Sequence, residues 1–150
     1  MLSPSVQALF DVMTGLWNTG NPALLSQVYS AEAVRVDPLN PEPARGIQQI
    51  GATLSAARAG FPDFQLHIKQ RIGDDEWVVT EWSTTGTHTG AFMGVPPTGR
   101  AATLHGVSVT RISGLKIVEE RGYFDRLALL QQLGVGPGAA QSAAAAAARP

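Results

Sequence analysis

The hydrophobic repeat of the chain changes its period once, near residue 64, and this change limits the possible folds more than any other feature. Before it, apolar residues recur every three or four positions, as on the buried side of a helix: Val6, Leu9, Phe10, Met13, Leu16 and Trp17. From Phe64 onward apolar and polar residues alternate, which is typical of half-buried strands. Helices followed by strands predict an α+β domain, in which a curved, mainly antiparallel sheet packs against the N-terminal helices.

Capping and turn residues divide the chain into elements. Ser3-Pro4 and Asn21-Pro22 are typical of helix starts and predict helices over residues 4–18 and 22–29. We expect a short extended piece at 33–37, a third helix from 47 to 59, and strands beginning at 64, 77, 102 and 116. A closing helix over 127–133 completes a predicted domain of residues 1–135. Residues 136–150 combine a Gly-Pro-Gly break with an alanine run, and we expect a mobile tail.

Charge and cysteine content exclude several classes of protein. Eleven Lys and Arg against twelve Asp and Glu give a formal net charge of -1. Phosphate backbones and anionic membranes attract clustered Lys and Arg, so we expect neither nucleic acid nor a membrane as a partner. Without cysteine there is no disulfide framework and no thiolate nucleophile. The N-terminal residues lack the pattern of a signal peptide, and we expect a soluble cytoplasmic protein.

A curved sheet covered by helices leaves a mostly apolar cavity, which suits a small-molecule ligand. We expect residues 90–99, rich in glycine and proline, to form a loop over the mouth of this cavity. Apolar positions expected on the outer side of the sheet would leave an exposed patch on a monomer, so we also predict a homodimer. These positions are Val107, Val109, Val118 and Phe124.

Several stretches resemble the SnoaL-like polyketide cyclases and their ester cyclase relatives. They are FPDF at 61–64, GTHTGAFMGVPPTGR at 86–100, RISGLKIVEE at 111–120 and YFDRLALLQQLG at 123–134, with ARGIQQI at the start of the third helix. The resemblance implies the cone-shaped fold of nuclear transport factor 2-like proteins, with a curved mixed sheet around a central cavity, commonly dimerised through the sheet. It also implies a cyclase that needs no cofactor.

In the cyclases that the chain resembles, an aspartate at the end of the last strand is the acid/base, and Asp125 is the position that matches. Simple alternation places Glu119, Arg121, Tyr123 and Asp125 on one polar face of the strand, which we expect to line the cavity. The alternative is that Asp125 only caps the helix that follows. Arg121, expected to bind substrate, stands where family members often have tryptophan, so the substrate preference of the family is not carried over.

The histidines and aromatic residues supply further candidates. His88, within GTHTG, is expected to bond a substrate carbonyl or orient the acid, or else to fix the end of its strand. His105 faces either the cavity or solvent. We expect Tyr123, Phe92 and Trp82 to line the pocket. The three histidines contain no close pair, so no metal site is expected.

Three functions remain open. The first is a cofactor-free cyclase, of the intramolecular aldol type, or a related lyase or isomerase that acts on a carbonyl-bearing small molecule. The second is an epoxide or ester hydrolase, in which an Arg-Asp pair activates water. Asp37 supplies the second acid for this reaction only if segment 33–37 faces the cavity. The third is a small-molecule binding protein without catalysis.

Overall fold

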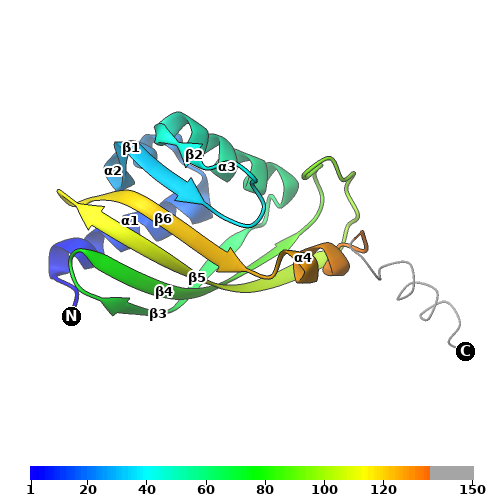
Figure 1. Cartoon of the computed structure of the whole chain (residues 1–150). Helices are drawn as coiled ribbons and strands as arrows, with labels where there is room; N and C mark the ends of the chain where they lie inside the picture. The colour runs from blue at the N-terminus through cyan, green and yellow to red at the C-terminus, as the bar shows by residue number, and fades with distance from the viewer. Residues whose placement is uncertain (136–150) are drawn as a thin grey trace, which may run out of the picture.

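The computed structural model describes residues 1–135 and contains a six-stranded curved sheet with three helical segments packed on one side (Figure 1). The strand order is β2-β1-β6-β5-β4-β3. Strand β1 runs parallel to β6, and every other neighbouring pair is antiparallel. The strands are β1 (Tyr29–Val36), β2 (Ala44–Arg45), β3 (Gln65–Gly73), β4 (Trp77–Thr87), β5 (Ala101–Ser113) and β6 (Lys116–Phe124).

The helices begin and end where the sequence signals predict. Helix α1 (Pro4–Thr19) starts at Ser3, whose side chain accepts from the Val6 N–H, and ends at Gly20, which adopts the left-handed φ of 69°. The short helix predicted at 22–29 is split into η1 (Pro22–Leu24) and α2 (Leu25–Val28). Helix α3 (Gly46–Gly60) and helix α4 (Arg126–Gln132) complete the set. The α+β layout is therefore confirmed.

The main core lies between the sheet and helices α1, α2 and α3. It is built from the apolar stripe of α1 and from inward side chains of the strands, and its fully buried members include Phe10, Leu16, Tyr29, Ile50, Val78 and Ile117. A smaller cluster of Phe61, Ala102, Leu129 and Leu133 packs α4 against the sheet. The region of the sheet between these two clusters is free to border a cavity.

A bulge in β6 reverses the face on which its later side chains lie. Ile112 pairs with Ile117, but Arg111 pairs with Glu119, so Val118 is an extra residue opposite β5. Ile117 points into the core, and without the bulge Glu119 would do the same. With the bulge, Glu120, Gly122 and Phe124 face inward. The expectation that the polar face of Glu119, Arg121, Tyr123 and Asp125 lines the cavity is corrected for this reason.

Two further expectations differ from the structure. The extended piece predicted at 33–37 is part of the longer strand β1 and is followed by the two-residue strand β2. Phe124, expected on the outer side of the sheet, instead lines the cavity. The predicted tail, residues 136–150, lies outside the described residues. Within residues 1–135, every helix is too short or too polar to cross a membrane.

Candidate active site

A cavity of about 350 Å³ lies between the inner face of the sheet and helices α1 and α3. Its walls are mainly apolar and include the aromatic side chains of Trp17, Phe64, Trp82, Phe92 and Phe124. Residues 91–93 of the loop between β4 and β5 also border it, as expected for a loop over the cavity mouth. The size and the walls suit a small, largely apolar ligand.

A cluster of charged side chains from β6 and from β1 with the residue that follows it borders the cavity. Arg35 forms ion pairs with Asp37, through Nη1, and with Glu120, through Nε at 2.7 Å from Oε1. The Tyr29 hydroxyl donates to the same Glu120 oxygen at 2.9 Å. The guanidinium also lies over the Trp17 ring, 4.8 Å from its centroid. Arg35, Asp37 and Glu120 all border the cavity.

The backbone explains why these side chains meet. Arg35 and Asp37 are two residues apart in an extended segment and therefore point to the same side. Parallel pairing places Arg35 directly beside Glu120 on β6. The bulge at Val118 turns Glu120 to the inner face. Two chain segments thus deliver one cation and two carboxylates to the same place.

The two carboxylates differ in how many hydrogen bonds they already accept. Asp37 accepts from the backbone N–H groups of Leu39 at 2.8 Å and Asn40 at 3.2 Å, from Asn40 Nδ2 at 3.1 Å, and from Arg35. Four donors fill the roughly four lone-pair positions of a carboxylate. Glu120 accepts only at Oε1, and no group within residues 1–135 donates to its Oε2. Glu120 is therefore the carboxylate with an oxygen open to a ligand.

Burial and charge fix the protonation of the two neighbours of Glu120. Burial, with the nearby negative charge of Glu120, raises the pKa of Tyr29 well above its usual value of 10.0, so the phenol stays a donor. Burial disfavours the charge of Arg35, but the negative charges around it outweigh this effect and raise the pKa of the guanidinium. Arg35 therefore stays a cation beside both carboxylates.

Trp82 forms a fixed wall of the cavity. Its indole lies against Gly106, where a Cβ would overlap the ring, and its Nε1 donates to Ser108 Oγ at 2.9 Å. The Phe124 ring meets it edge to face, with centroids 5.9 Å apart. These three contacts leave the indole little freedom to rotate.

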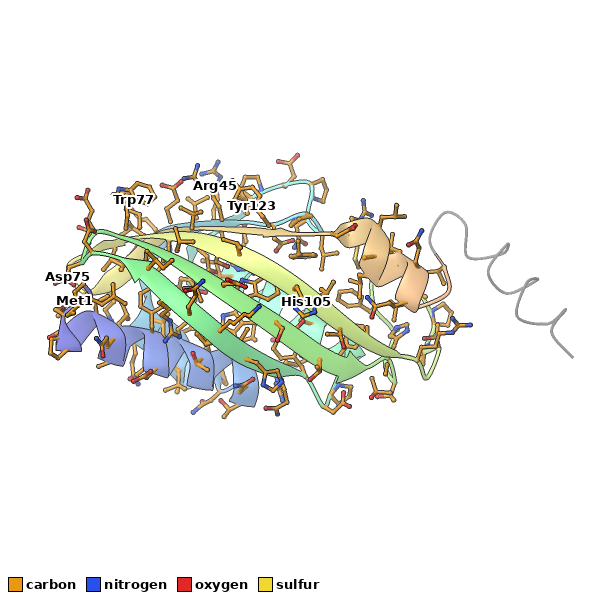
Figure 2. The ribbon with its side chains drawn as sticks, turned by 90° about the horizontal axis from the view of Figure 1, so that it is seen from below. Met1, Arg45, Asp75, Trp77, His105 and Tyr123 are labelled. Carbon is orange, nitrogen blue, oxygen red and sulfur yellow. The ribbon has the colours of Figure 1, made fainter. Side chains whose placement is uncertain are left out.

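Of the residues predicted for the site, Trp82 and Phe92 border the cavity, as expected. Arg121, Tyr123 and His105 do not border it. They lie on the outer face of the sheet, where Figure 2 labels His105 and Tyr123 together with Trp77. Tyr123 is 55% exposed, and the Arg121 guanidinium lies 5.9 Å from the centroid of the Trp77 ring.

His88 is fully buried behind the cavity wall and does not border the cavity itself. Its Nδ1 accepts from the Thr98 N–H at 3.2 Å, which places the proton on Nε2, and Thr98 Oγ1 lies 2.9 Å away. The ring stacks on Phe61, which in turn contacts Phe92. His88 therefore holds the β4–β5 loop in place, which matches the structural alternative considered for it.

Asp125 is exposed and forms the N-cap of α4, where Oδ1 accepts from the Ala128 N–H at 3.0 Å. It does not border the cavity. This arrangement matches the capping alternative.

Sequence reasoning missed Tyr29, Arg35 and Glu120, and considered Asp37 only as a conditional second acid. Arg35 and Asp37 do carry a signal, because two charged residues with strand spacing occur in a short apolar segment. Glu120 carries none, since its direction depends on the bulge.

Within the described chain, no group of three or more acidic or histidine side chains is arranged to hold a metal ion.

Comparisons with known proteins agree with this fold. The family model described as SnoaL-like polyketide cyclase matches residues 7–133. Aklanonic acid methyl ester cyclase DauD from Streptomyces sp. (strain C5) is 29% identical over an alignment of 138 positions, and the match covers 89% of this chain and 83% of the relative. IdmH from Streptomyces antibioticus aligns with a TM-score of 0.74 and 26% identity, over 87% of this chain and 99% of that protein. A protein with a ketosteroid isomerase-like fold from Catenulispora acidiphila aligns with a TM-score of 0.70 and 19% identity, over 85% and 92% of the two chains, which is a likeness of fold.

Proposed function

The chain belongs to the SnoaL-like polyketide cyclase family, which supports a small-molecule enzyme of the cyclase or isomerase type, and we propose that Glu120 is the acid/base of its reaction. The observation that carries the proposal is the open Oε2 of Glu120 in a cavity with aromatic walls. Asp37 borders the same cavity, but its oxygens are already occupied. The proposed reaction needs no cofactor.

The proposed reaction is an intramolecular aldol closure. Glu120 takes a proton from a carbon next to a carbonyl group, and the electron pair of the broken C–H bond forms an enolate. The enolate carbon bonds to a second carbonyl carbon of the same molecule, whose oxygen becomes an alkoxide. Glu120 returns the proton to this oxygen, so the product is an isomer of the substrate. Tyr29 and Arg35 hold the other carboxylate oxygen and keep Oε2 directed at the ligand.

The walls of the cavity favour a substrate with flat, apolar rings. Phe64, Trp82, Phe92 and Phe124 offer ring surfaces on different sides. The charged cluster of Arg35, Asp37 and Glu120 is held together by ion pairs, so the reacting carbonyl group belongs on the part of the molecule that meets this cluster. A polyketide-like or aromatic ketone fits both requirements.

Two assays test the proposal. The first follows the cyclisation of aklanonic acid methyl ester, chosen because the relative DauD is named for it. The second follows deuterium exchange at the carbon next to the carbonyl group of 1-tetralone in heavy water, by proton NMR. We expect the protein to accelerate exchange above the buffer rate. If it accelerates neither reaction but binds both molecules, the protein is a binding protein and the proposal fails.

A second candidate reaction is epoxide hydrolysis, which the position of Asp37 in the cavity favours. One carboxylate of the Arg35 cluster would take a proton from water, whose oxygen attacks a ring carbon, while the other carboxyl group in its protonated form gives a proton to the ring oxygen. The product is a diol. Styrene oxide in water labelled with oxygen-18 tests this candidate, because hydrolysis places one labelled oxygen in the diol.

A further inference from the structure

Thr80 borders the cavity and carries a buried hydroxyl without a hydrogen-bond partner. The residue is 1% exposed and borders the cavity, and its Oγ1 makes no hydrogen bond. Buried hydroxyl groups are nearly always paired, so an unpaired one at a cavity wall marks a place for a ligand atom. A threonine hydroxyl can donate as well as accept.

Ser108 lies directly opposite Thr80 in the pairing of β4 with β5, and it borders the same cavity. Its Oγ accepts from Trp82 Nε1 at 2.9 Å, and because an indole only donates, this bond uses a lone pair of the serine. The serine hydroxyl proton is therefore still available, and within residues 1–135 no group accepts it. Accepting a bond also strengthens a hydroxyl as a donor.

Gly122, the partner of Ser108 on β6, leaves an unfilled position beside the Ser108 hydroxyl. A Cβ built there would lie 3.7 Å from the Asp37 Cβ, 3.9 Å from Ser108 Oγ and 3.9 Å from the Val36 carbonyl oxygen. These are ordinary contact distances, so the position has room for one heavy atom. The Cα atoms of Glu120 and Gly122 are two strand residues apart, about 7 Å.

We propose that Thr80 and Ser108, beside the open position at Gly122, form a subsite that binds an acceptor oxygen of the substrate. Two donors on adjacent strands suit a carbonyl oxygen, or the enolate oxygen that forms from it. An alkyl group would leave both hydroxyls unpaired. The inference deepens the proposed function and rests on it, because it names the carbonyl oxygen as the polar group that orients the substrate beside Glu120.

The test compares two probes that differ in one oxygen. 1-Tetralone carries a ketone, and tetralin has the same ring system without it. Binding of each is measured by quenching of tryptophan fluorescence, since Trp17 and Trp82 border the cavity. We expect the wild-type protein to bind 1-tetralone at least fivefold more tightly than tetralin, as one net hydrogen bond corresponds to about fivefold in affinity.

Thr80→Val removes the hydroxyl and keeps the shape, and Thr110→Val is the matched control. Thr110 Oγ1 is also buried and unpaired, but Thr110 does not border the cavity. We expect Thr80→Val to lower the preference for the ketone about fivefold while its melting temperature stays equal or rises. Thr110→Val should keep the preference. Gly122→Ala should fold normally and also lose the preference, because its methyl group fills the open position.

The carbonyl carbon-13 signal of labelled 1-tetralone supplies a second readout. Hydrogen bonds to the oxygen move this signal downfield, so the bound probe should shift upfield in Thr80→Val relative to wild type. An unchanged preference and carbonyl shift in both Thr80→Val and Gly122→Ala would overturn the subsite, as would a wild-type protein that binds tetralin as tightly as the ketone. Failure of the proposed function would appear separately, as a retained ketone preference without deuterium exchange.

Discussion

At the scale of single residues, the direction of the Glu120 carboxylate depends on two donors that share one oxygen. Tyr29 and Arg35 both donate to Oε1, which leaves Oε2 without a donor from residues 1–135, and Glu120 borders the cavity. A hydrogen bond to a charged group contributes about 1.5–3 kcal/mol to stability. Tyr29 is therefore a positioning residue as well as a part of the core.

Tyr29→Phe tests the contribution of the Tyr29 hydroxyl through the dependence of the free energy of unfolding on pH. The pKa of Tyr29 is raised in the folded protein, so its contribution is fully present below the unfolded pKa of about 10 and is lost as the pH rises above it. We expect wild type to be more stable than Tyr29→Phe at pH 8 and the difference to shrink by pH 10.5. Urea unfolding at both pH values measures it. If wild type and Tyr29→Phe differed in free energy of unfolding by the same amount at pH 8 and at pH 10.5, ionisation of Tyr29 would not be the cause of any loss of stability at high pH.

Asp125→Asn separates the two roles considered for Asp125. Asparagine can still accept the bond from the Ala128 N–H, so we expect the free energy of unfolding to change by less than about 1 kcal/mol. We expect turnover to stay within about fivefold of wild type, which corresponds to 1 kcal/mol. A loss of a hundredfold or more in a folded variant would instead return the acid/base role to Asp125.

At the scale of elements, the loop between β4 and β5 is joined to the end of α3 by backbone contacts. The Gly60 carbonyl oxygen accepts from the N–H groups of Thr89 at 3.2 Å and Gly90 at 3.1 Å. A Cβ on Gly90 would overlap the carbonyl oxygen of Ala59. Because both partners are backbone, neither can move unless the loop separates from the helix.

We expect Gly90→Ala to destabilise the protein by about 1–3 kcal/mol. Gly15→Ala in α1 is the matched control, because a Cβ there meets nothing within 4 Å. That change should stabilise the helix by about 0.5–1 kcal/mol. Thermal unfolding of both variants measures the difference. Equal melting temperatures for Gly90→Ala and wild type would show that the loop is not held in this way.

The elements could be predicted largely from the sequence, but the site could not. Helix caps such as Ser3 and the two-residue alternation after Phe64 are local signals, and the structure confirms what they predict. The inward direction of Glu120 depends on one extra residue, Val118, opposite a regular strand. A bulge has no local sequence signal, so alternation counted from Ile117 selects Glu119 instead. Trp82 and Phe92 were found because aromatic residues on strand or loop positions near a cavity usually line it.

At the scale of the whole molecule, the outer face of the sheet carries apolar side chains with large exposed fractions. Trp77 and Tyr123 lie there, as Figure 2 shows, and Val79 is 39% exposed. Val107 and Val109 follow on β5, with side chains on the same outer face. Phe124, which we expected to be part of this patch, belongs to the cavity instead.

The prediction of a homodimer through this face stands. Light scattering at micromolar concentration should give twice the chain mass of 15.8 kDa. Val79→Asp should give a folded monomer, because the side chain is partly exposed and a charge there opposes burial against a second copy. A mass of one chain for the wild-type protein would contradict the prediction.

The central claim is that Glu120 exchanges a proton with a carbonyl compound in the cavity, and Glu120→Gln against Glu119→Gln tests it most directly. The two residues are neighbours, but Glu119 lies on the outer face with Arg111 and Arg121. Both variants replace a glutamate carboxylate with the uncharged amide of glutamine. The measurement is the rate of deuterium exchange next to the carbonyl group of 1-tetralone. We expect Glu120→Gln to lose about 100- to 10,000-fold of the catalysed rate and Glu119→Gln to keep it. Equal rates for the two variants would contradict the claim.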